Sequence, residues 1–174
     1  VNNAGDKPFM EEPTLEMLTG EYDVISWKHC FPVSHILEDT GHPDVASEEK
    51  RLENYKLQYA ALKEKMLQFP KTKFIVWTPA ALVKKVTSEG EGRHARDFAA
   101  WVKDEWDVKG DNIFVWDFHE LETEGGLFLK PEYGVDEGNS HPTPAFSKTA
   151  APCFARRIVD VIEGRGDSGS ITGK

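Results

Sequence analysis

A histidine near the end of the chain is the side chain best placed to do chemistry. His141 stands in "DEGNSHPTPAF" (residues 136–146), between a turn-forming stretch and the start of a predicted helix. The glycine, asparagine and proline residues there predict a loop before the helix. An imidazole titrates near neutral pH and can act as a general base, although a surface histidine without any chemical role fits the same position. Asp136 and Asn139 are polar residues of the same loop.

A second group of reactive side chains follows an apolar run earlier in the chain. His29, Cys30 and Ser34 lie in "KHCFPVSH" (28–35). A cysteine beside a histidine suggests a nucleophile and its base, but adjacent residues of an extended segment point in opposite directions, so we interpret Cys30 as a small buried residue. The spacing of the histidines and cysteines matches no common ligand pattern, and we predict no metal site.

Composition limits the function classes. The 174 residues are 39% hydrophobic, and the formal net charge is −9. This size predicts one domain, and the negative charge argues against nucleic acid or an anionic membrane as a partner. No glycine-rich loop directly follows a predicted strand, so we predict no cofactor. We expect residues 1–163 to form the domain and the glycine-rich residues 164–174 to form a flexible tail.

Strands and helices alternate along the chain. Residues 22–27, 73–78 and 112–118 are short runs rich in β-branched and aromatic residues, which predict buried strands. Apolar stripes with helical spacing predict helices over about 52–69, 93–106 and 145–163. This order predicts parallel strands joined by right-handed crossovers, hence a flavodoxin-like three-layer α/β/α sandwich.

The predicted topology places the reactive residues at one edge of the sheet. Ligands of parallel sheets bind beyond the carboxyl ends of the strands. The segments 28–35, 79–92 and 119–142 all follow predicted strands. We therefore expect His29, Ser34 and His141 to lie at the same edge.

Two segments resemble a known family. The stretch "GNSHPTPAFSKTAAPCFARRIVDVI" resembles the closing segment of SGNH (GDSL-type) hydrolases, in which a catalytic histidine followed by proline leads into the last helix. "YDVISWKHCFPVSHI" is similar to the family's middle strand and the loop after it. The resemblance covers residues 14–163 and implies ester hydrolysis by a serine nucleophile, a histidine base, an aspartate and an oxyanion hole. His141 matches the base.

The chain departs from the family pattern at three places. The aspartate that precedes the family histidine by three residues falls on Gly138, so Asp136 is the candidate partner of His141. The oxyanion-loop asparagine falls on Val33, which leaves Ser34 as a donor, with His29 and Asn139 as further candidates for substrate binding. The serine-bearing strand of the family precedes every segment recognised here, and we interpret the GDS triplet at 166–168 as accidental because no predicted strand precedes it.

Three functions follow from this reading. The first is an SGNH-type hydrolase of acyl or acetyl esters of a small molecule or carbohydrate, whose first strands and serine lie on an upstream segment or a second chain. The second is a catalytically silent SGNH-like binding module. The third is another flavodoxin-like protein that binds a phosphate at the same strand ends, which the missing glycine-rich loop disfavours.

Overall fold

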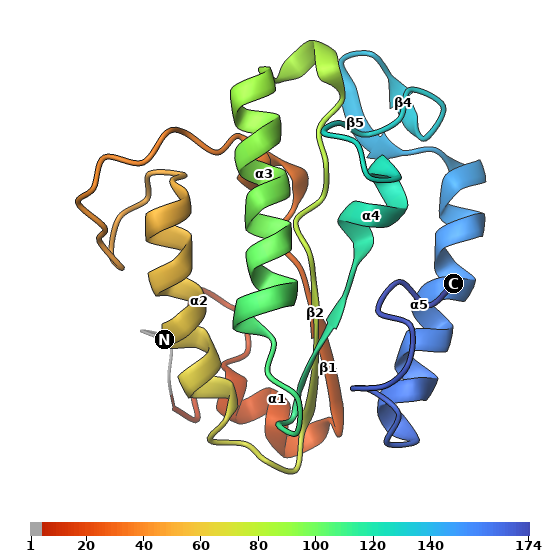
Figure 1. Ribbon diagram of the computed structural model, residues 1–174. Helices are drawn as coiled ribbons and strands as arrows, with labels where there is room; N and C mark the ends of the chain where they lie inside the picture. The colour runs from red at the N-terminus through yellow and green to blue at the C-terminus, as the bar shows by residue number, and fades with distance from the viewer. Residues whose placement is uncertain (1–4) are drawn as a thin grey trace.

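A parallel sheet with helices on both sides forms the centre of the molecule (Figure 1). The computed structural model describes residues 5–174. Strands β1 (Val24–Trp27), β2 (Lys73–Trp77) and β3 (Ile113–Trp116) pair in parallel in the order β1-β2-β3. The prediction of an α/β fold with parallel strands is confirmed.

Three long helices cover the two faces of the sheet. Helices α2 (Leu52–Met66) and α3 (Glu89–Trp101) lie on one face, and α5 (Pro144–Ile162) lies on the other (Figure 1). The shorter elements are α1 (Leu15–Glu21), a 3₁₀ turn at Phe31–Ser34, another at Lys84–Val86, a π-helical turn at Val102–Trp106, and α4 (Phe118–Thr123). No helix among residues 5–174 is both long enough and apolar enough to cross a membrane.

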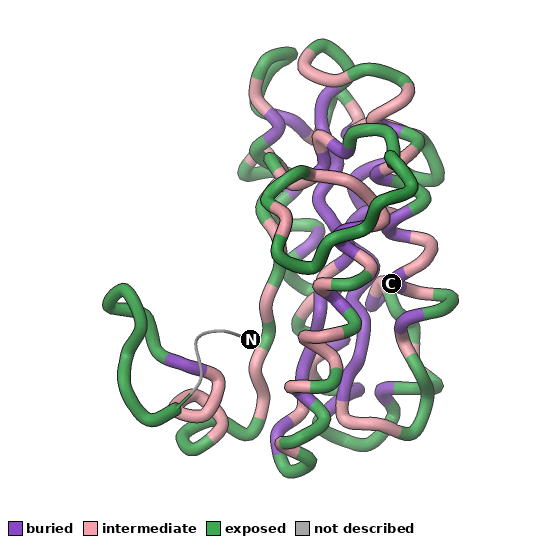
Figure 2. The backbone as a smooth tube through the Cα atoms, turned by 90° about the vertical axis from the view of Figure 1, so that its left-hand side faces the viewer, coloured by how far each residue is buried: buried purple, intermediate pink, exposed green. Residues whose placement is uncertain are grey.

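A separate apolar core fills the space between each face and its helices. Tyr59 and Phe98 belong to the core on the α2 and α3 side, whereas Trp116 and Phe146 belong to the core on the α5 side. Buried residues concentrate along the strands, and exposed residues follow the loops (Figure 2). The helical spacing of apolar residues from Phe146 onward predicts that Ile162 faces inward, and this is wrong: Ile162 is 55% exposed, because Val161 takes the buried position in the last turn of α5.

Local hydrogen bonds explain where some elements begin. Helix α3 starts at Glu89, earlier than its apolar stripe indicates, because Ser88 and Glu91 form a capping box. The stretch 119–142, predicted as one long loop, contains most of α4 and a hairpin of β4 (Gly134–Asp136) and β5 (Asn139–Pro142). Asp117 starts α4 by accepting a hydrogen bond from the Glu120 backbone N–H.

The segment 164–174 packs against β3 and α5, although its glycine content predicts a flexible tail. The Ile171 carbonyl accepts from the Asp117 N–H at 2.8 Å, and the Thr172 carbonyl accepts from Trp116 Nε1 at 2.9 Å. Arg157, on α5, donates to the Gly166 carbonyl at 2.6 Å. Hydrogen bonds to its backbone carbonyls hold this segment in place, so its glycine content does not predict how it packs.

The two edges of the sheet differ. Residues 171 and 172 bond at the carboxyl end of β3, whereas β1 pairs only with β2 within the described part of the chain. None of the four β1 residues is fully buried. An edge strand of this kind presents unpaired backbone N–H and C=O groups to any strand that approaches it.

Candidate functional site

A cavity of about 300 Å³ lies at the carboxyl ends of the strands, on the α5 face of the sheet. Residues after β1, at the ends of β2 and β3, and on α4, β5 and α5 all contribute to its wall. Most of the wall is aromatic: Phe31, Trp77, Trp116, Phe118, Phe146 and Phe154. Its few polar groups include Lys28, Glu122 and His141. An apolar cavity with a small number of polar groups is the usual form of a small-molecule site.

Asn139 orients His141 at the rim of this cavity. The Asn139 side-chain oxygen Oδ1 lies 3.0 Å from the His141 backbone N and 2.7 Å from its ring Nδ1. The backbone N–H can only donate, so the amide atom it meets must be the oxygen. Nδ1 therefore carries the proton that it donates to the same oxygen, so that Nε2 is the nitrogen that can accept a proton whenever the ring is neutral. The imidazole is in the tautomer that a general base requires.

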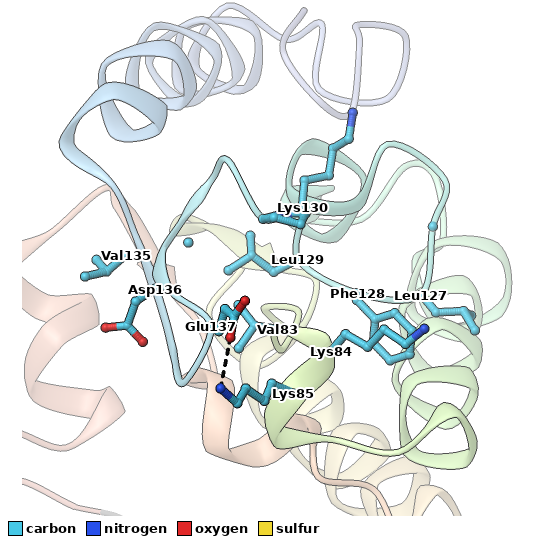
Figure 3. A pocket seen from close by; sticks show the side chains of 13 residues that line it. Val83, Lys84, Lys85, Leu127, Phe128, Leu129, Lys130, Val135, Asp136 and Glu137 are labelled. Atoms are coloured by element: carbon cyan, nitrogen blue, oxygen red, sulfur yellow. Dashed lines mark hydrogen bonds and ion pairs between the residues drawn. The ribbon is translucent and has the colours of Figure 1, made fainter.

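Asp136 does not contact His141. Its carboxylate accepts from the Gly138 N–H at 2.7 Å, which closes the turn between β4 and β5. It lines a second cavity of about 750 Å³ on the β4 side of the hairpin, together with Val83, Phe128 and Leu129 (Figure 3). Lys85 and Glu137 form an ion pair at 2.9 Å there. Asn139, which the sequence predicts to bind substrate, instead hydrogen-bonds the His141 ring. For that role the sequence suggests Asp136.

His29 lies on the opposite face of the sheet from His141. Side chains after β1 alternate between the faces, so Lys28 and Cys30 line the cavity while the His29 ring packs 5.5 Å from the Tyr59 ring. Its Nδ1 has no hydrogen-bond partner among residues 5–174, and burial lowers the pKa of the ring. The expectation that His29 shares a site with His141 is not met.

Ser34 is also unavailable as an oxyanion donor. Its side chain is buried, and its hydroxyl donates to the Ala80 carbonyl. The interpretation of Cys30 as buried is wrong, because its side chain is exposed and lines the same cavity as His141. Successive side chains after β1 point to opposite faces of the sheet, which explains why Cys30 lies in the cavity and His29 does not.

Glu122 is a site residue that no sequence motif indicated. It is 1% exposed, and its Oε2 accepts from the Ala81 N–H at 2.7 Å, while Oε1 has no hydrogen-bond partner in the described part of the chain. Burial raises the pKa of this carboxyl to about 8, against smaller opposing effects of the Ala81 N–H and Lys28. A signal does exist in the sequence, because Glu122 is four residues after Phe118 and so shares its inward helical face.

Comparison of the chain with protein-family models, with curated proteins and with solved structures finds no match.

The arrangement combines an imidazole oriented by Asn139 with an apolar cavity. No serine hydroxyl among residues 5–174 is hydrogen-bonded to the His141 ring. The described residues therefore place an oriented imidazole at the rim of a cavity, without a nucleophile hydrogen-bonded to it.

Proposed function

We propose that this chain forms the histidine-bearing part of an SGNH-type ester hydrolase with a flavodoxin-like fold, acting on acyl or acetyl esters of a small molecule or carbohydrate. The observation that carries the proposal is the 2.7 Å hydrogen bond between Asn139 Oδ1 and His141 Nδ1 at the rim of an aromatic cavity. The sequence resemblance around His141 and the position of the cavity beyond the strand ends add support.

In this mechanism His141 acts as the general base. Its Nε2 takes the proton of a serine hydroxyl while the serine oxygen attacks the ester carbonyl carbon, and the imidazolium then gives the proton to the leaving alkoxide. Water attacks the acyl-serine in the same way and regenerates the serine. Asn139 keeps the ring in the required tautomer, as in the Cys-His-Asn variant of the catalytic triad, but its neutral amide stabilises the imidazolium less than a carboxylate would.

The serine is proposed to arrive on a strand that pairs with β1, from an upstream segment or a second chain. Residues 171 and 172 already bond at the carboxyl end of β3, so β1 is the edge with room for a further parallel strand. The carboxyl end of such a strand would lie next to Lys28 and Cys30, at the cavity.

A binding module without turnover is the second candidate. The Ser34 hydroxyl donates its hydrogen bond to the Ala80 carbonyl and so cannot donate to an oxyanion, which a hydrolase requires. This observation favours the binding module. In this case the cavity binds its ligand and His141 only contributes a hydrogen bond.

The test uses the protein as isolated from its source. We expect labelling by a fluorophosphonate probe and hydrolysis of p-nitrophenyl acetate, and we expect His141→Ala to lower kcat/KM by about 100-fold or more. His42→Ala, an exposed loop histidine, is the control and leaves the rate unchanged. Asn139→Asp raises the rate, because a carboxylate stabilises the imidazolium. Hydrolysis at the wild-type rate by His141→Ala, or neither labelling nor hydrolysis, refutes the hydrolase.

A further inference from the structure

The unpaired carboxyl oxygen of Glu122 points to a specific kind of ligand. We propose that Glu122, as the neutral acid, donates a hydrogen bond from Oε1 to the carbonyl oxygen of an uncharged, ring-sized ligand held in the aromatic cavity. This proposal does not depend on the proposed hydrolysis, because a carbonyl compound that is never cleaved can also accept the hydrogen bond from Oε1.

The Ala81 backbone decides which oxygen carries the proton. An N–H can only donate, so Oε2, 2.7 Å from the Ala81 nitrogen, acts as the acceptor of the pair. The carbonyl oxygen of a carboxylic acid is a stronger acceptor than its hydroxyl oxygen, so the hydroxyl hydrogen of the neutral acid belongs on Oε1. Oε1 is buried without a partner among residues 5–174, and a buried donor that lacks an acceptor is destabilising until a ligand supplies one.

The surroundings of Glu122 keep it neutral near pH 7. Burial is the main cause of its raised pKa. The titratable groups that share its cavity are Lys28 after β1, whose Nζ lies 5.5 Å from the Trp77 ring centroid, Cys30, and His141 on β5. On its own helix, the His119 ring is directed to the Pro79 carbonyl at 3.1 Å. Among the described residues, none of these groups forms an ion pair with Glu122.

The size and lining of the cavity define the rest of the ligand. An apolar cavity of about 150 Å³ accommodates benzene, so a cavity of about 300 Å³ admits a substituted ring. Aromatic side chains around it favour a flat or apolar body. A cationic ligand would need Glu122 ionised and would meet Lys28 in the same cavity, so the charges favour an uncharged ligand.

The experiment compares three small probes with the wild-type protein. Acetophenone has a carbonyl acceptor, ethylbenzene has the same shape without one, and benzyltrimethylammonium carries a positive charge. Binding is followed by NMR on the indole N–H signals of Trp77 and Trp116, which line the cavity. At pH 7 we expect acetophenone to bind about tenfold more tightly than ethylbenzene, the factor expected for one neutral hydrogen bond.

Variants and pH separate the alternatives. Ionisation removes the donor, so the preference for acetophenone falls as pH rises through about 8 in the wild type. Glu122→Gln, whose amide N–H₂ replaces the hydroxyl, keeps the preference at every pH, and Glu122→Leu abolishes it. Glu124→Gln, an exposed neighbour, behaves as wild type.

Three results overturn the proposal. Equal affinity for acetophenone and ethylbenzene means that Oε1 bonds elsewhere, for example to water. Binding of benzyltrimethylammonium that strengthens with pH and is lost in Glu122→Gln assigns the site to cations. No binding of any probe at millimolar concentration removes the site. Loss of ester hydrolysis with the acetophenone preference intact overturns only the proposed function.

Discussion

The cost of keeping Glu122 neutral predicts a stability effect that grows with pH. Its carboxyl pKa is raised from 4.5 to about 8 in the folded protein. Below pH 4.5 both states are protonated and the group has no effect. Between these values the unfolded chain loses the proton and the folded protein keeps it, so the free energy of unfolding falls by about 1.4 kcal/mol per pH unit. At pH 7 the accumulated loss is at most about 3.5 kcal/mol.

Glu122→Gln removes this titration and keeps the shape of the side chain. The glutamine oxygen can still accept from the Ala81 N–H, so packing and one hydrogen bond are retained. The variant should equal the wild type near pH 4.5 and become progressively more stable than it toward pH 7. The measurement is urea unfolding of both proteins at about pH 5, 6 and 7, with the free energy extrapolated to water.

The control is Glu124→Gln, next to the same helix. The Lys130 side chain lowers the pKa of Glu124, which is exposed. The ionised Glu124 stabilises the fold, and this effect is lost only as pH falls through the lowered pKa. The difference in unfolding free energy between Glu124→Gln and the wild type therefore stays constant over the same pH range. A constant difference for Glu122→Gln as well, or one that shrinks with rising pH, would refute the neutral buried carboxyl.

Three further predictions concern other parts of the fold. Arg157→Met leaves the Val115 and Gly166 carbonyls without their donor and should lower the free energy of unfolding, measured by urea unfolding, by about 2–5 kcal/mol. Arg156→Met, at an exposed position, should stay near the wild-type stability. Deletion of residues 169–174 removes the acceptor of a tryptophan indole, so the melting temperature should fall and the fluorescence emission shift to the red; an unchanged spectrum contradicts the packing of this segment. N-ethylmaleimide should modify the exposed Cys30 faster than the half-buried Cys153, and acetophenone should slow only the Cys30 reaction; equal rates would be evidence against the exposure of Cys30 in the cavity.

The main elements of the fold were predictable because each has a simple periodic signal. The runs around Ile75 and Val115 are buried on both sides, which requires continuous apolar residues. Ala95, Phe98 and Val102 recur at helical spacing and are all buried. Helix α4 and the hairpin after it were missed because they are too short for periodicity to reveal and depend on caps and turns.

The candidate site was predictable only in part. His141 stands out by its place between a turn and a helix, but its partner depends on how the β4–β5 turn bends. That bend directs Asp136 to the Gly138 N–H and brings Asn139 to the ring. The spacing of Glu122 from Phe118 indicates an inward helical face, but its place in the cavity depends on a wall assembled from segments far apart in the chain. Spacing along a sequence cannot indicate a contact that tertiary structure creates.

The path of the chain through the sheet explains why there is a cavity at all. Each new strand is added beside the previous one, so the connecting helices α2 and α3 both fall on one face. The other face receives α5 and the segment 164–174, and α5 contacts β2 and β3. The cavity lies at the carboxyl end of this face, where the segment after β1, α4 and β5 complete its wall, so the cavity depends on several backbone segments more than on any one side chain. Substitutions in the wall of the cavity should therefore change which ligand it accepts well before they close it.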